Sequence, residues 1–168
     1  NSGPYKLSGT ATDFKVVVST NCTLTLHSYN SSMPVHLLTQ HLEPTIQVNS
    51  GATLTLLIEG TSTLQSGGNH AGINVQEGGT LIIDKVEGKT DVQCVLKVTG
   101  GDDGAGIGAN RDGNCGNITI NGGTINATGG KEAAGIGGGN VTSVYHVTVG
   151  TIKINGGIVN ATGTKNSA

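Results

Sequence analysis

Apolar and polar residues alternate in five short segments spaced along the chain. These segments read Thr-Leu-Thr-Leu or a close variant, and they cover residues 23–26, 53–56, 80–83, 117–120 and 151–154. A period of two is typical of a β-strand with one buried face. Aligned, the segments give two columns that hold only Leu or Ile: Leu24, Leu54, Leu81, Ile118 and Ile152, then Leu26, Leu56, Ile83, Ile120 and Ile154. We therefore predict five equivalent strands whose aliphatic side chains stack in one core.

Longer repeats follow the same spacing. Residues 121–130 (NGGTINATGG) recur 34 residues later as residues 155–164 (NGGIVNATGT). The tripeptide Ala-Gly-Ile occurs three times and predicts a third inward column of Ile73, Ile107 and Ile136, with glycines at the corners. The best candidate for helix is residues 35–42, which could be one or two helical turns or a loop inserted in the first coil.

Strands that alternate with glycine turns at a repeat near 30 residues predict an all-β fold, a parallel β-solenoid or β-helix. A single coil cannot bury its aliphatic side chains, whereas stacked coils bury a continuous core. We expect about five coils, right-handed as parallel crossover connections usually are. We expect a single domain, with residues 1–44 as an N-terminal capping or edge segment and residues 45–168 as the repeats.

The composition excludes some classes of function but does not identify one. The 168 residues include 29 Gly, 2% aromatic residues and 12% charged residues, and the net charge is −2. Such a chain lacks the basic surface that nucleic-acid binding requires. It also lacks an apolar run of the ~18 residues that would span a bilayer. We expect no cofactor.

The glycine-rich motifs resemble those of a known class of proteins. The NGGTINATGG and AGIGGG segments are similar to the repeats of large secreted surface proteins, the adhesin-type β-helices of the pectate-lyase-like superfamily. The resemblance covers about residues 45–164 and is strongest from residue 104 onward. It implies a secreted, cell-surface location, adhesion and contact with extracellular glycans.

Two residue types suggest covalent modification. The odd number of cysteines, Cys22, Cys94 and Cys115, allows at most one internal disulfide. A Cys94–Cys115 pair is one interpretation, because we expect these residues in neighbouring turns, and three buried free thiols is the other. Asn-x-Ser/Thr sites, which carry glycans in secreted eukaryotic proteins, occur at Asn21, Asn30, Asn117, Asn126, Asn140 and Asn160.

Catalytic and metal chemistry have weaker support. An acidic cluster of Asp102, Asp103 and Asp112 beside Arg111 could serve a polysaccharide lyase or hydrolase, but solvated turn residues explain it better. The histidines are scattered, so we predict no metal site; they are His27, His36, His41, His70 and His146. Outward threonines beside the aliphatic columns leave an ice-binding surface as an alternative.

The ends of a solenoid expose strand edges that template further strands. The sheet-prone run at Phe14, Val16 and Val18 is the candidate self-assembly edge, and the C-terminal end carries no strong cap. We therefore expect a non-enzymatic extracellular module that builds a head-to-tail filament or surface fibre. A monomeric glycan-binding adhesin is the runner-up.

Overall fold

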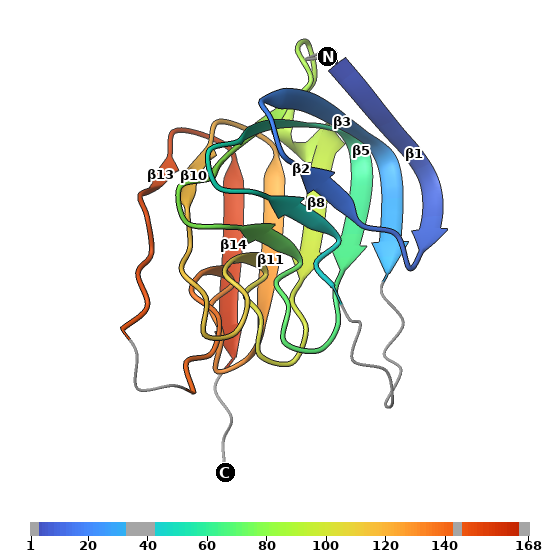
Figure 1. Cartoon of the computed structure of the whole chain (residues 1–168). Helices are drawn as coiled ribbons and strands as arrows, with labels where there is room; N and C mark the ends of the chain where they lie inside the picture. The colour runs from blue at the N-terminus through green and yellow to red at the C-terminus, as the bar shows by residue number, and fades with distance from the viewer. Residues whose placement is uncertain (1–3, 33–42, 143–145, 165–168) are drawn as a thin grey trace.

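The chain folds as a parallel β-helix. The computed structural model describes residues 4–32, 43–142 and 146–164, which exclude the segment 35–42 for which a helix was considered. Within these ranges the chain winds through five successive coils, and every paired strand runs parallel to its neighbours (Figure 1). Each coil contributes strands to three sides of the stack.

The first side is a five-stranded sheet with one short strand from each coil. In chain order its strands are β2 (Val16–Val18), β4 (Ile46–Val48), β6 (Ile73–Val75), β9 (Ile107–Gly108) and β12 (Ile136–Gly137).

A nine-stranded sheet bends to form the second and third sides. β3 (Cys22–Ser32) and β5 (Thr53–Gln65) run along both sides, and β1 (Pro4–Thr12) pairs with β3 at the edge. The later coils divide the path between two strands. The second side continues in β7 (Thr80–Lys85), β10 (Asn117–Ile120) and β13 (Ile152–Ile154). The third side continues in β8 (Cys94–Thr99), preceded by the 3₁₀ turn η1 (Asp91–Gln93), then β11 (Thr124–Lys131) and β14 (Ile158–Thr164).

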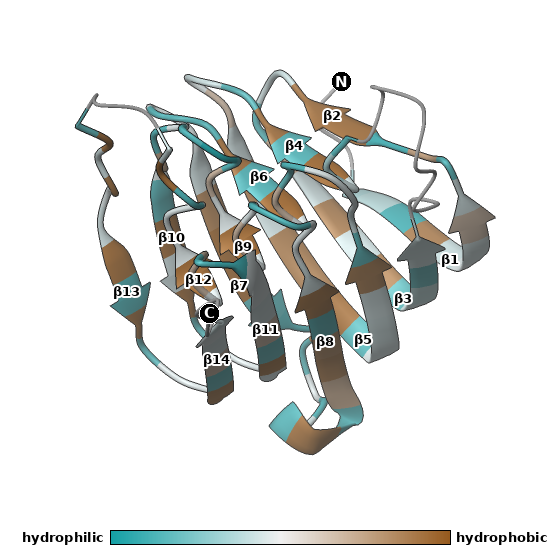
Figure 2. Ribbon diagram, turned by 90° about the horizontal axis from the view of Figure 1, so that it is seen from below, coloured by the Kyte–Doolittle hydropathy of each residue, from teal (hydrophilic) through white to brown (hydrophobic). Residues whose placement is uncertain are grey.

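Inward-facing aliphatic residues form the core. Figure 2 shows the alternation along β4 and β13, where a hydrophilic residue lies between two hydrophobic ones. The columns predicted for the last four coils are confirmed, because Leu54 pairs with Leu81, Leu81 with Ile118 and Ile118 with Ile152. Side chains such as Leu56, Leu81 and Ile118 are fully buried. Each contributes roughly 1.5–3 kcal/mol to folding.

The register predicted for the first coil is wrong by two residues. Cys22 pairs with Leu54, Leu24 with Leu56 and Leu26 with Ile58. A shift of two keeps every side chain on its face, so the alternation alone cannot detect it. The corner of the coil fixes the register: Ser28 and Gly60, 32 residues apart, both have positive φ and stack. The Tyr29 backbone N–H then donates to Ser62 Oγ at 2.9 Å.

The third predicted column is also present. Ile73, Ile107 and Ile136 pair in register on the first side. The column continues into the first two coils through Ile46 and Val16. Residues 4–32, within the proposed N-terminal segment, therefore contribute strands to the same sheets as the repeats.

Outward residues of the second side follow the corrected register. One column of this surface consists of Thr23, Thr55, Ile82, Thr119 and Lys153. An apolar and a charged side chain thus interrupt the threonine array on which the ice-binding alternative depends.

Glycine is required where neighbouring coils approach most closely. Gly108 has a φ of +142, and a Cβ at this position would lie within 3.0 Å of the backbone C and N atoms of Gly137 in the next coil. Exposed Gly51 has a φ of +77 but open space where its Cβ would be. The two positions separate the effect of close packing from that of backbone conformation.

We expect Gly108→Ala to lower the free energy of unfolding by about 3 kcal/mol, because the coils must separate locally. Gly51→Ala should cost about 1 kcal/mol, the strain of a left-handed residue alone. Urea denaturation monitored by circular dichroism measures both values. Equal effects of the two substitutions would show that coil spacing does not depend on Gly108.

Candidate functional site

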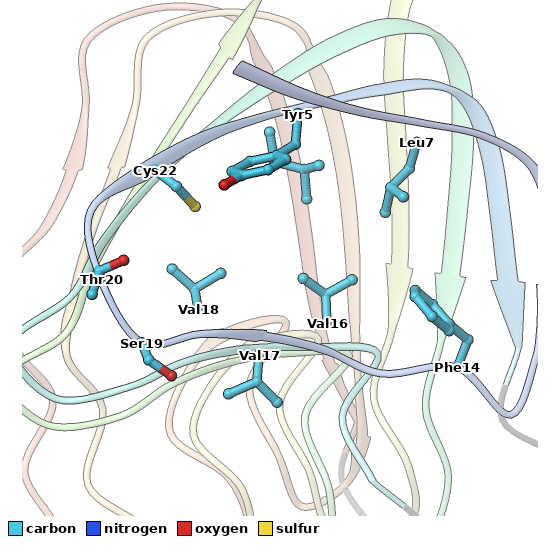
Figure 3. Close-up of a pocket in the computed structure, with 10 residues that line it drawn as sticks. Tyr5, Leu7, Phe14, Val16, Val17, Val18, Ser19, Thr20 and Cys22 are labelled. Carbon is cyan, nitrogen blue, oxygen red and sulfur yellow. The ribbon is translucent and has the colours of Figure 1, made fainter. Parts of the chain in front are cut away.

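The N-terminal end of the stack is hollow. All three residues of the predicted assembly edge, Phe14, Val16 and Val18, line an apolar opening of about 340 Å³ (Figure 3). They lie on and beside β2, which pairs with β4 on one edge only. The sequence interpretation thus selected residues that the fold brings together.

Two further residues of the hollow were missed from the sequence. Tyr5 and Leu7 on β1 stack in register on Leu24 and Leu26 of β3, which extends the aliphatic columns to the edge of the stack. The sequence signal that could have found them is the alternation of apolar residues at positions 5 and 7 with polar Lys6 between them, which is typical of a strand with one buried face.

The C-terminal end exposes the same columns. Ile152 is 39% exposed and Ile154 is 56% exposed, whereas their register partners Ile118 and Ile120 in the preceding coil are fully buried. On the third side, Val159 pairs in register with fully buried Ile125 and is itself only partly buried. These side chains point the same way as the core, but no described coil covers them.

The acidic residues considered for catalysis form a hydrogen-bonded loop network. Arg111 lies between Asp103 and Asp112, with its guanidinium nitrogens 3.4 and 3.3 Å from their carboxylate oxygens. Asp112 also accepts hydrogen bonds from the backbone N–H and the hydroxyl of Thr142, at 2.7 and 2.8 Å. Asn140 donates to Asp103 at 2.9 Å. These contacts fasten the loop of the last coil to that of the coil before it.

Asp102 stands apart from this network. Its carboxylate is exposed, and its backbone oxygen accepts the N–H of Lys131. The structure therefore brings Asp103, Arg111 and Asp112 together and leaves the fourth predicted member outside.

The cysteines are free thiols, and the proposed Cys94–Cys115 disulfide is not formed. The two residues lie near opposite ends of β10: Cys115 precedes that strand, and the backbone oxygen of Cys94 lies near Gly123, which follows it. A strand of four residues spans roughly 13 Å, beyond the reach of a disulfide. Burial raises the pKa of the Cys115 thiol to about 11 and also raises that of half-buried Cys22.

Most glycosylation-type asparagines face outward. Asn21, Asn30, Asn117 and Asn160 are exposed, and Asn126 and Asn140 are half-buried. Asn126 and Asn160 pair in register, as their repeat predicts, and the amide of Asn160 donates to that of Asn126 at 2.9 Å. Asn117 accepts the Thr151 N–H, so part of this surface is an amide ladder between coils.

The described histidines do not converge. His27 Nδ1 lies 2.9 Å from Glu59 Oε2, and Lys6 Nζ lies 3.1 Å from the same oxygen. Hydrogen bonds from Lys6 and then His27 lower the pKa of Glu59. His70 has its pKa lowered by burial. Among residues 4–32, 43–142 and 146–164, no group of three His, Cys, Asp or Glu side chains is placed to hold a metal ion; His36 and His41 lie outside these ranges.

Comparison with known proteins agrees with this architecture. Residues 118–140 and 152–168 match a family model described as a beta helix repeat. The match supports a β-helix family. It covers most of β10 and then β11, β12, β13 and β14, which belong to the last two coils. Neither the curated proteins nor the solved structures gave a significant match. No described helix of this β-helix has the length and apolar character needed to cross a membrane.

We expect the acidic network to support the fold. Asp112→Ala should lower the free energy of unfolding by about 1–2 kcal/mol, because three donors lose their acceptor. It should also speed hydrogen exchange at the Thr142 amide. Asp102→Ala, a matched control from the same cluster, should change stability by less than about 0.5 kcal/mol. Equal stability of the two variants, measured by urea denaturation, would contradict this role.

Alkylation tests the state of the cysteines. At pH 8, iodoacetamide should modify Cys22 in the native protein and leave Cys94 and Cys115 intact, because burial excludes the reagent from both side chains, and the raised pKa of Cys115 also removes its reactive thiolate. In denaturant all three thiols should react, as measured by intact mass. A single adduct in denaturant would instead show an internal disulfide.

Proposed function

We propose that the chain is a non-enzymatic extracellular structural module that associates end to end with further copies of itself. One observation carries the proposal: both ends of the coil stack expose the aliphatic columns that are buried everywhere between them. Single exposed aliphatic residues are ordinary at a protein surface, but a contiguous apolar end marks an interaction site.

A second copy is the occupant that fits both ends. The two ends have the same three-sided outline, and all strands run parallel. On the first side the free edge of β2 can meet that of β12. On the other two sides β1 can meet β13 and β14. Pairing between different ends of identical chains is heterologous and does not close, so it generates a filament.

The contacts of the charged side chains on the flanks of the stack favour a structural role rather than a catalytic one. Asp103, Arg111 and Asp112 hold adjacent loops together, and their hydrogen bonds are made to Asn140 and Thr142. A carboxylate engaged in this way is a poor general base for a glycosidic bond. The extracellular location rests on the outward-facing glycosylation-type asparagines and on the resemblance to secreted surface proteins.

Charged substitutions at the two ends test the assembly. Phe14 is 45% exposed and Ile154 is 56% exposed, so Lys is tolerated at either position in a single molecule. Val18 is only 4% exposed and would confound the test, because a buried charge would disrupt the first coil. Val92, which is 69% exposed on η1 away from both ends, provides the matched control.

We expect the unmodified chain to form oligomers that grow with concentration in analytical ultracentrifugation and filaments in negative-stain images. Phe14→Lys and Ile154→Lys should each yield monomers with unchanged circular dichroism and thermal unfolding. Val92→Lys should assemble normally. A chain that is monomeric at every concentration, or end variants that assemble as the control does, would refute the proposal.

A further inference from the structure

The three sides of the stack contain unequal numbers of described strands. The first side has five, from β2 to β12. The second side has six, and so has the third, because β1 extends both of them beyond β3; on the second side they are β1, β3, β5, β7, β10 and β13. At the N-terminal end, the first side therefore stops one strand short of the other two. The edge of β2 that faces away from β4 borders the hollow and pairs with no described strand.

The unequal count limits how two copies can join. When β1 of one copy pairs with β13 and β14 of another, equivalent strands of the two copies are six strand spacings apart on the second and third sides. The first side supplies only five strands over the same length. The edges of β12 and β2 then lie two spacings of ~4.8 Å apart, and they meet only through one further strand.

The free edge of β2 presents backbone groups to such a strand. The Val16 N–H donates to the Thr45 oxygen at 2.9 Å. The Val18 oxygen accepts the Asn49 N–H at 2.9 Å, so both valines use their backbone groups toward β4. Backbone groups of alternate residues in a strand point to opposite neighbours. The N–H and C=O of Val17 therefore point to the free edge, which is a template for a further strand.

The side chains of β2 define what the further strand must carry. Val16 and Val18 point into the hollow, toward the side chains that β1 contributes (Figure 3). Val17 points away from the hollow and is 50% exposed. On the other edge, β4 places Ile46 and Val48 against Val16 and Val18 in register. A strand on the free edge continues these two columns when aliphatic residues occupy alternate positions along it.

The hollow has room for two aliphatic side chains. Its volume is about 340 Å³. An apolar cavity of roughly 150 Å³ is already enough to hold a benzene ring. None of the described residues that line the hollow is charged, so a charged side chain would be buried there without a partner. The hollow thus selects an apolar strand over a charged one.

We propose that the free edge of β2 binds one extended β-strand of a further chain, parallel to β2 and with aliphatic residues at alternate positions. The backbone of this strand pairs with Val17, and its aliphatic side chains fill the hollow, which is recognition by β-strand addition. In the assembly the strand lies between β12 of one copy and β2 of another. Its place in the joint rests on the proposed function, whereas its binding to a single molecule does not.

Hydrogen exchange on a single molecule tests the strand site. The Ile154→Lys variant keeps the N-terminal end unchanged, so binding can be measured without self-association. The probe is a synthetic peptide with the sequence of residues 44–50, which contains β4. At saturating peptide, exchange at the Val17 amide should slow by about fivefold or more, while exchange at the Val16 amide, which already has a partner, should stay the same. Unchanged exchange at Val17 would overturn the proposal.

Two controls separate strand pairing from uptake of any apolar group. The same peptide with Ile46→Lys and Val48→Lys should leave exchange at Val17 unchanged. Val17→Pro removes the N–H at the free edge and keeps the groups that pair with β4, so it should weaken peptide binding by about tenfold or more in an NMR titration. Val17→Thr, which retains the N–H, should bind as its parent does. Equal effects of the two peptides would contradict strand pairing even if Val17→Pro fails to fold.

The unmodified chain tests the place of the strand in the joint. The peptide of residues 44–50 should lower the concentration at which oligomers form by about threefold or more in analytical ultracentrifugation, because it fills the missing position. If the peptide protects Val17 but blocks association, the strand competes with the second copy, and its placement in the joint is wrong. A chain that never associates would refute end-to-end association and this placement, while binding of the strand to β2 would stand.

Discussion

Registered stacking of aliphatic side chains between coils is the interaction on which the whole structure depends. The chain has no tryptophan and one phenylalanine, and among the described residues Tyr29 is the one aromatic side chain of the buried core, so aliphatic side chains supply nearly all of its packing. Each coil is stable because Leu or Ile of the next coil lies directly above its own, at the ~4.8 Å spacing of parallel strands. The same spacing sets the demands on every corner, where backbones of successive coils approach too closely for a Cβ at positions such as Gly108.

The stacking of coils also determines which parts of the surface are apolar and which are polar. Because the columns run the full length of the stack, apolar groups can be exposed together only at its two ends, where Leu7 and Val16 lie at one end and Ile154 at the other. The flanks carry the polar alternates of each strand and the loops between strands. The proposed self-association therefore belongs to the ends, and a polar substitution on the flanks need not affect it.

Sequence alone predicted the parts of the fold that repeat with regular spacing. Alternation and the Ala-Gly-Ile tripeptide located the strands of the last four coils because one register there satisfies every column. In the first coil, Cys22 to Leu26 offers two registers with the same faces buried, and the corner at Ser28 and Gly60 decides between them. A serine at positive φ carries little signal in the sequence. The proposed disulfide failed because neighbouring turns were treated as adjacent, although Cys94 and Cys115 occupy different corners.

The candidate sites differ in the same way. The Phe14–Val18 edge was predictable because it is a local property of one strand. The role of Asp103 and Asp112 was not, since their hydrogen-bond partners Asn140 and Thr142 come from the loop of the next coil. Contacts between loops depend on where each loop leaves its coil, and these loops do not share the alternation of the strands. The regular repeat therefore predicts the core of this β-helix, whereas the contacts on its flanks become visible only in the folded chain.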